Sequence, residues 1–200
     1  MLSLKDRLGL LERDLVASPP GFVMNADLPF AIFRYDPNLP EEGEWRMRRE
    51  IGNLAVRVEN ATQRHVRLVS LAQVFWRAIE KSEGIDALAD LEREQGFLKA
   101  QEQVGTYLSD ADFQPLPDLL AAELAPSDPN KDFVFLTRAA VFAPSSYRIS
   151  SLLEQMKGMT RIPTVLFYPG TWQESLNFMG LRQSEAPLGS YRVKIYGRES

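Results

Sequence analysis

Unalternated runs of apolar residues recur along the chain and predict strands that are buried on both faces. Three such runs are PFAIFRYDP at 29–37, DFVFLTRAAVFA at 132–143 and RIPTVLFYPG at 161–170. A further strand, the second in chain order, is predicted for HVRLVSL at 65–71, which passes directly into a helical pattern. The runs at 132–143 and 161–170 are thus the third and fourth strands. Strands that are apolar throughout are typical of parallel sheets covered by helices on both sides.

Between these runs, apolar residues recur at helical spacing. The leucines of segment 4–15 form one stripe of an amphipathic helix, and a second helix is predicted across 41–60. Segment 71–125 is helical in pattern throughout, which is far more chain than a crossover between parallel strands requires. We therefore expect an inserted helical segment at about 85–125 within a single domain spanning 1–200.

The closing stretch YRVKIYG at 191–197 alternates between apolar and polar residues, unlike the other strands. With Tyr191, Val193 and Ile195 on one face, it predicts a half-exposed edge strand. Together these patterns predict an α/β fold with three layers and a mainly parallel sheet, of the P-loop or Rossmann-like type.

Composition narrows the class of protein. The 200 residues are 44% hydrophobic and 25% charged, they include no cysteine, and the net charge is −4. These values predict a globular protein of a reducing, cytoplasmic compartment, with no overall attraction to nucleic acid or anionic membranes. No apolar run approaches the roughly 20 residues of a membrane-spanning helix.

Nucleotide chemistry is disfavoured at the carboxyl ends of the predicted strands, where open parallel sheets bind their ligands. Neither the P-loop pattern nor G-x-G-x-x-G occurs, and Pro37 and Pro40 interrupt the turn after the first strand. We predict a P-loop-like fold without a P-loop and with no bound cofactor.

Acids and nucleophiles are equally sparse there. Asp36 ends the first strand and Glu174 follows the fourth, so a cryptic metal-dependent hydrolase built on these two carboxylates remains an alternative. His65, the single histidine, begins a strand and so lies at the opposite edge. Ser145 and Ser146 precede a helix and are interpreted as caps. We assign no catalytic residue and no metal ligand, and predict that the chain is not an enzyme.

The second predicted helix carries a group of arginines. Arg46, Arg49 and Arg57 share one helix face and are the candidate nucleic-acid-binding residues. Glutamates are interleaved with them at helical spacing, which is typical of a solvated face. These glutamates are Glu41, Glu42, Glu44, Glu50 and Glu59. Nucleic-acid binding is therefore the alternative to a protein-binding role.

Aromatic and charged residues near the strand ends are the candidate partner-binding groups, since Trp, Tyr and Arg are enriched at interface hot spots. The candidates are Tyr35, Asp36, Trp45, Arg138, Tyr168 and Trp172. Trp76 is a further candidate for an exposed docking patch, and Arg138 is also placed to brace Asp36 internally.

Several of these stretches, in this order, resemble the BrxB family of small proteins from BREX bacteriophage-exclusion systems. They are PFAIFRYDP, RHVRLVSLAQVFWRAIE, DFVFLTRAAVFAPSSYRISSLLEQM, IPTVLFYPGTWQESLNFMG and YRVKIYG. PTVLFYPG followed by SLNFMG is the most specific part. The chain departs from the family pattern at TRAAVFAP, which lacks a glycine in the turn.

The resemblance implies a cytoplasmic component of an antiphage defence system. The partners it implies are a PglZ-like protein of the alkaline-phosphatase superfamily, an AAA-type ATPase and an adenine DNA methyltransferase. It brings no catalytic residues to this chain. The expected function is a non-catalytic adaptor or scaffold that bridges these larger proteins.

Overall fold

A computed structural model of the protein describes residues 2–23, 27–143, 145, 147–173, 175–180 and 193–197. The helices are α1 (Leu4–Val16), α2 (Glu44–Thr62), α3 (Leu71–Lys81), α4 (Gly84–Gln95), α5 (Phe97–Ser109), α6 (Leu116–Leu124) and α7 (Ile149–Gln155), with a 3₁₀ helix η1 (Ala139–Phe142). The strands are β1 (Phe30–Tyr35), β2 (His65–Ser70), β3 (Asp132–Thr137), β4 (Thr164–Gln173), β5 (Ser175–Phe178) and β6 (Lys194–Tyr196). No helix in the described ranges combines the length and the apolar character needed to cross a bilayer.

The sheet has the order β2-β3-β4-β1-β6, and all the neighbouring strands along this path run parallel. β5 pairs antiparallel with the far end of β4 and forms a hairpin with it. After β1 the chain crosses to β2 at the far edge of the sheet. It later adds β4 on one side of β1 and β6 on the other. The predicted mainly parallel sheet is confirmed.

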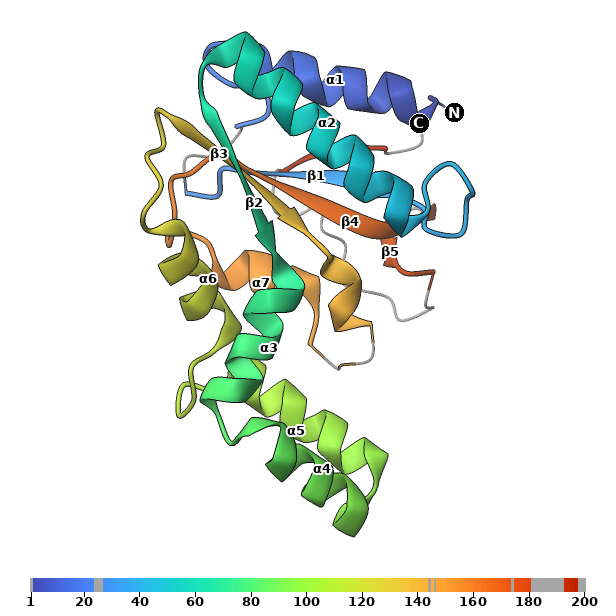
Figure 1. Ribbon diagram of the computed structural model, residues 1–200, viewed down its shortest axis with the longest axis vertical. Helices are drawn as coiled ribbons and strands as arrows, with labels where there is room; N and C mark the ends of the chain where they lie inside the picture. Colours follow the sequence, from blue (N-terminus) through green and yellow to red (C-terminus); the bar gives the residue numbers. More distant parts are fainter. Residues whose placement is uncertain are drawn as a thin grey trace.

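Helices cover both faces of this sheet, which gives three layers (Figure 1). On one face α1 and α2 pack over a cluster that includes Phe33, Phe133 and Phe167. On the other face α3, α6 and α7 enclose a larger cluster. All six residues of β1 are buried, as expected for a strand with helices on both sides.

Three of the predicted strands differ from their observed form. The third ends at Thr137, and Ala139–Phe142 turns into η1 because Arg138 adopts a left-handed backbone with φ of 59°. The fourth continues beyond Gly170 into the β4–β5 hairpin. β2 is the outermost strand of the sheet path, so it exposes Leu68 rather than burying both faces.

The closing edge strand exists, but it is less exposed than its alternation predicts. Tyr196, on the face opposite to that of Ile195, is 4% exposed and packs in the cluster beneath α1 and α2. Val193 and Ile195 are partly buried against the other cluster. Tyr191 lies outside the described residues.

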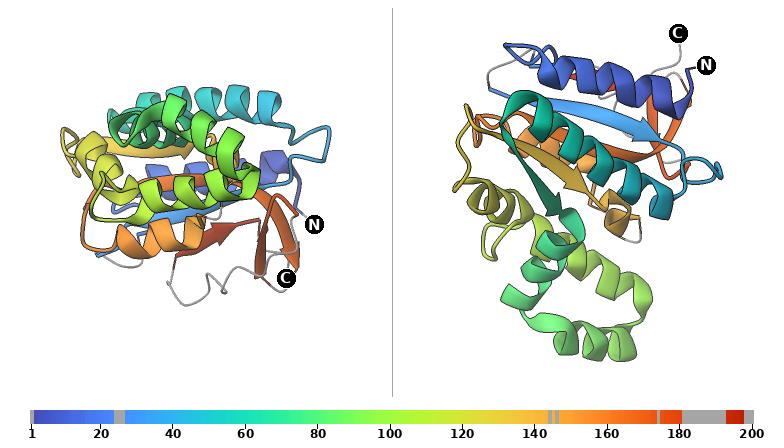
Figure 2. Two further views of the ribbon diagram at one scale, coloured as in Figure 1. Left: turned by 90° about the horizontal axis from the view of Figure 1, so that it is seen from below. Right: turned by 45° about the horizontal axis from the view of Figure 1, so that its top comes forward.

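Between β2 and β3 the chain forms the helices α3, α4, α5 and α6. α6 packs beside α3 on the sheet, whereas α4 and α5 form an antiparallel pair that extends away from it (Figures 1 and 2). α4 has no buried residue. We call this pair the α4–α5 hairpin.

Asp14 ties α1 to the edge strand β6. Its carboxylate accepts hydrogen bonds from the Tyr196 hydroxyl and, at 2.6 Å, from Lys194 Nζ. Partial burial raises the pKa of Asp14, but these two donors and the Lys194 charge outweigh it, so the pKa is lowered overall from 3.8.

Replacing Asp14 by asparagine is expected to reduce stability at pH 7 by about 1 kcal/mol or less, because the site is partly open to solvent. A lowered folded-state pKa contributes stability above the unfolded value that is lost as pH falls through the folded value. The urea midpoints of the native protein and the variant should therefore converge below pH 3.8. A difference that is independent of pH would show that the carboxylate charge is not the stabilising element.

Candidate partner-binding surfaces and the carboxyl edge of the sheet

The carboxyl end of β1 lies beside β4 at the point where β4 enters the β4–β5 hairpin, with Tyr35 paired to Pro169. The connection after β1 runs over the face of the sheet that α2 covers, whereas the connections after β2 and β3 run over the opposite face. In open α/β sheets, ligands usually bind at the strand ends where the connections change from one face to the other.

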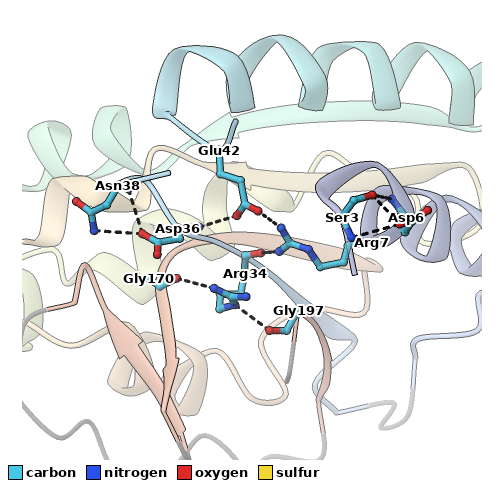
Figure 3. A network of polar contacts seen from close by, with 9 residues as sticks. All are labelled: Ser3, Asp6, Arg7, Arg34, Asp36, Asn38, Glu42, Gly170 and Gly197. Carbon is cyan, nitrogen blue, oxygen red and sulfur yellow. Dashed lines mark hydrogen bonds and ion pairs between the residues drawn. The ribbon is translucent and has the colours of Figure 1, made fainter. Parts of the chain in front are cut away.

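A buried arginine lies at these strand ends, beside β4 and β6. Arg34, on β1, is 2% exposed, and its Nε donates to the carbonyl of Gly197 at 2.8 Å. Its Nη1 donates to the carbonyl of Gly170 at 3.4 Å. The guanidinium therefore joins Gly197, after β6, to Gly170 of β4, with β1 between them (Figure 3).

A second buried arginine connects α1 to β1 and to the turn before α2. Arg7, on α1, donates from Nη1 to the carbonyl of Arg34 at 2.7 Å and forms an ion pair with Glu42 through Nη2. The second carboxylate oxygen of Glu42 accepts from the backbone N–H of Asp36 at 2.8 Å. Arg7 and Glu42 are 2% and 5% exposed. We call Arg7, Arg34 and Glu42 the buried charge network (Figure 3).

The interpretation of Glu42 as part of a solvated helix face is therefore wrong. α2 begins at Glu44, so Glu42 belongs to the preceding turn, and α1 lies across that turn. This contact joins residues 35 positions apart. Nothing in the local pattern of the sequence distinguishes Glu42 from its exposed neighbours.

Asp36 acts as a turn residue. Its Oδ1 accepts from the backbone N–H of Asn38 at 3.0 Å and from Asn38 Nδ2 at 3.1 Å. The expected brace with Arg138 does not form, because β4 separates the strands that carry them and two strand spacings measure about 10 Å. Glu174 lies outside the described residues, and within the described ranges no three His, Cys, Asp or Glu residues are grouped to hold a metal ion.

Tyr35 and Tyr168 are core residues and not surface contacts, which corrects their selection as partner-binding groups. They are 2% and 0% exposed. The hydroxyl of Tyr35 donates to Glu44 at 2.5 Å, and burial, followed by the Glu44 charge, raises the pKa of Tyr35. Tyr168 packs its ring edge-on against Phe178. Both side chains face helical layers that their local sequence does not reveal.

The other candidates reach the surface to different degrees. Trp45, in the first turn of α2, is 82% exposed. Arg138 is exposed beside Trp76 and Glu80 of α3, with which it lines a small polar depression. Trp172 is partly buried against the larger core cluster. Trp45 and Arg138 are thus available to a partner.

The candidate nucleic-acid-binding arginines lie on the exposed side of α2, but carboxylates accompany them. Arg57 Nε pairs with Glu12 of α1 at 2.9 Å, and Arg49 pairs with Glu50 at 3.9 Å. Arg46 lines a groove between α1 and α2 that also includes Glu12 and Glu50. The surface has both signs of charge and does not form a basic stripe for phosphates.

The remaining polar candidates are structural. His65 is exposed at the start of β2 and contacts Glu59 through Nδ1 at 2.7 Å. Ser145 does not cap α7, because the cap position is Arg148. Its hydroxyl donates to the carbonyl of Phe142 and accepts from the N–H of Tyr147 within a turn.

The sequence candidates do not point to an apolar groove that lies at the base of the α4–α5 hairpin, although Trp76 is in its wall. Its volume is about 330 Å³. The walls are Phe75, Trp76 and Ile79 of α3, Leu88 and Glu92 of α4, Phe97, Ala100, Gln101 and Val104 of α5, and Ala140, Val141 and Ser145 near η1. We call it the hairpin groove. In the sequence, the groove is indicated only by the helical spacing of its lining residues on α5, which are Phe97, Ala100, Gln101 and Val104.

Comparison with known proteins places the chain in a family. The family described as "BREX protein BrxB" matches residues 67–194. A relative from Bacillus cereus (strain H3081.97), named BREX protein BrxB, is 26% identical over 149 residues, which cover 73% of this chain and 72% of the relative. No solved structure matches the chain. With nearly two thirds of its length matched, the chain belongs to the BrxB family of BREX proteins.

Proposed function

We propose that this BREX component is a non-catalytic adaptor of an antiphage defence system, holding larger proteins of that system together. The observation that carries the proposal is the buried charge network. Where related architectures bind a ligand, Arg7, Arg34 and Glu42 bond to one another's backbone or side chains and to neighbouring carbonyls. These contacts hold the edge of the sheet together, which supports a structural role for it rather than a catalytic one.

Bridging requires separate surfaces, and two exposed features are available. Trp45 projects from the start of α2, on the side of the sheet that α1 also covers. The α4–α5 hairpin extends from the opposite side (Figure 1). An isolated exposed tryptophan of this kind is a favourable interface anchor. Two partners could therefore be held at once without competing for one surface.

The partners we propose are the PglZ-like phosphatase-superfamily protein and the AAA-type ATPase, with the adenine methyltransferase as a third. The test is affinity purification of the tagged chain after co-expression with the rest of its BREX system. We expect at least two of these proteins to be recovered with it. Elution of the tagged chain alone would contradict an adaptor role.

Two sets of variants sharpen this test. Trp45→Ala should reduce recovery of one partner by about tenfold while the other is retained, as expected for loss of a hot spot. Val56→Ala, on the exposed side of the same helix, is the matched control.

Asp36→Ala should leave phage restriction intact. Loss of restriction by Asp36→Ala, with the complex still assembled, would point to catalysis instead.

A further inference from the structure

The hairpin groove is apolar inside and remains open at its edges. Most of its lining is aliphatic or aromatic, and the polar groups that reach it are Glu92, Gln101 and Ser145. Around it, large apolar side chains stay in contact with solvent. Trp76 is 47%, Phe97 57% and Leu98 76% exposed. Clusters of exposed apolar residues on a protein of this size mark interaction sites.

The hairpin around the groove is strongly acidic. Between positions 84 and 109 there are five acidic residues and two basic ones, Arg93 and Lys99. Both basic residues are already paired within the hairpin, Arg93 with Asp90 and Lys99 with Glu102. In the described part of the chain Asp86, Glu92 and Glu94 form no ion pair. Of these three, Glu92 lines the groove, so the wall of the groove carries a carboxylate that pairs with no basic side chain of the described residues.

The walls of the groove also limit what shape of segment fits it. They are provided by α3, α4, α5 and η1, whose backbone groups are engaged in their own helices. An extended peptide would find no strand edge to pair with here and would leave its own backbone groups unpaired in an apolar site. A helix satisfies its backbone internally and presents apolar side chains along one face, which is the usual occupant of such a groove.

We propose that the hairpin groove binds an amphipathic helix of a partner protein whose apolar face enters the groove and whose polar face is rich in Lys and Arg. The apolar face is recognised by Phe75, Trp76, Leu88, Phe97 and Val104, and the basic face by Glu92 together with the net negative charge of the hairpin. This proposal rests on the adaptor function and names the chemistry of one of its partners.

The first test uses designed peptides of about 18 residues, which form five helical turns. One is an amphipathic helix of Leu and Lys, the second has the same composition in scrambled order, and the third replaces Lys by Glu. In fluorescence anisotropy the first should bind the full-length chain about tenfold more tightly than the others. Equal binding of the scrambled peptide, or tighter binding of the Glu peptide, would overturn the proposal.

Groove variants connect that binding to the site. Phe97→Ser and Glu92→Lys should each weaken the Leu/Lys peptide by about tenfold, the loss expected for a contact that acts as a hot spot. Both side chains are exposed, so folding is not at stake. Val56→Ser and Glu154→Lys, exposed on α2 and α7, are the matched controls. Wild-type affinity in the two groove variants would place the peptide elsewhere and reject the groove.

The natural partner is identified by photo-crosslinking in the co-expressed BREX system. A photoreactive amino acid at Leu98 should crosslink a segment with apolar residues at helical spacing and an excess of Lys and Arg, and one at Val56 should not. A crosslink to an acidic or non-helical segment, or to a second copy of this chain, would overturn the proposal. If Phe97→Ser and Glu92→Lys leave the whole complex assembled, the groove proposal fails while the adaptor function stands.

Discussion

Replacing Arg7 by methionine is expected to lower the free energy of unfolding by about 3–5 kcal/mol, the range for a buried ion pair that loses one partner. Glu42 would stay buried at 5% exposure with its charge no longer compensated, and the carbonyl of Arg34 would lose its donor. Methionine fills much of the same volume, so the decrease in the free energy of unfolding arises from the lost charge and hydrogen bonds more than from a cavity. Urea denaturation followed by circular dichroism measures this decrease.

Two further variants separate the burial of charge from its removal. The double variant Arg7→Met/Glu42→Leu should recover part of the loss, because no uncompensated carboxylate remains in the core. Arg48→Met breaks the exposed pair with Glu44 and should cost less than about 1 kcal/mol. If Arg7→Met and Arg48→Met were equally mild, the network would not stabilise the edge of the sheet, and the adaptor proposal would lose its main support.

Gly170→Ala is the second substitution with a large expected effect. A Cβ at this position would lie 2.3 Å from the backbone oxygen of Asn177 and 2.8 Å from Cε1 of Tyr168. Asn177 belongs to β5, so one strand of the hairpin would have to move away from the other. That movement also displaces the carbonyl of Gly170 from Arg34. We expect a loss of about 3 kcal/mol, at the upper end of the range for overpacking.

The matched control is Gly52→Ala in the middle of α2. A Cβ there meets no atom within 4 Å, so the only change is the lower conformational freedom of the unfolded chain and better helix propensity. Stability should rise by about 0.5–1 kcal/mol. Thermal unfolding compares the two variants directly. Equal stability of Gly170→Ala and the native protein would mean that the β4–β5 hairpin is not packed as described.

Much of the architecture could be predicted because it follows from local patterns. The unalternated run 161–170 became part of β4, between β3 and β1, and the leucine stripe of 4–15 became the buried face of α1. The missing glycine motifs and Pro37 and Pro40 were also visible in the sequence. Such features depend on residues a few positions apart, whose spacing determines which side of a helix or strand is apolar.

The candidate site was predicted less well, because its contacts join distant segments. Arg7 and Glu42 are 35 residues apart, and Arg34 reaches Gly197 across 163 positions. Tyr35 and Tyr168 were selected as candidate partner-binding groups, but they are buried, and the layers that cover them come from other parts of the chain. In the hairpin groove, α5 meets residues of α3 and η1, so neither its apolar spacing nor its acidity alone could reveal a cavity.

By itself, then, the sequence determined the order and type of most elements, the lack of the P-loop and G-x-G-x-x-G motifs, and the relationship to BrxB. Only the tertiary structure decided that Arg7 and Glu42 are buried partners, that two candidate tyrosines are core, and that the α4–α5 hairpin extends from the body. The physical reason is that periodicity encodes which face an element must bury. Which other element covers that face depends on how distant segments pack.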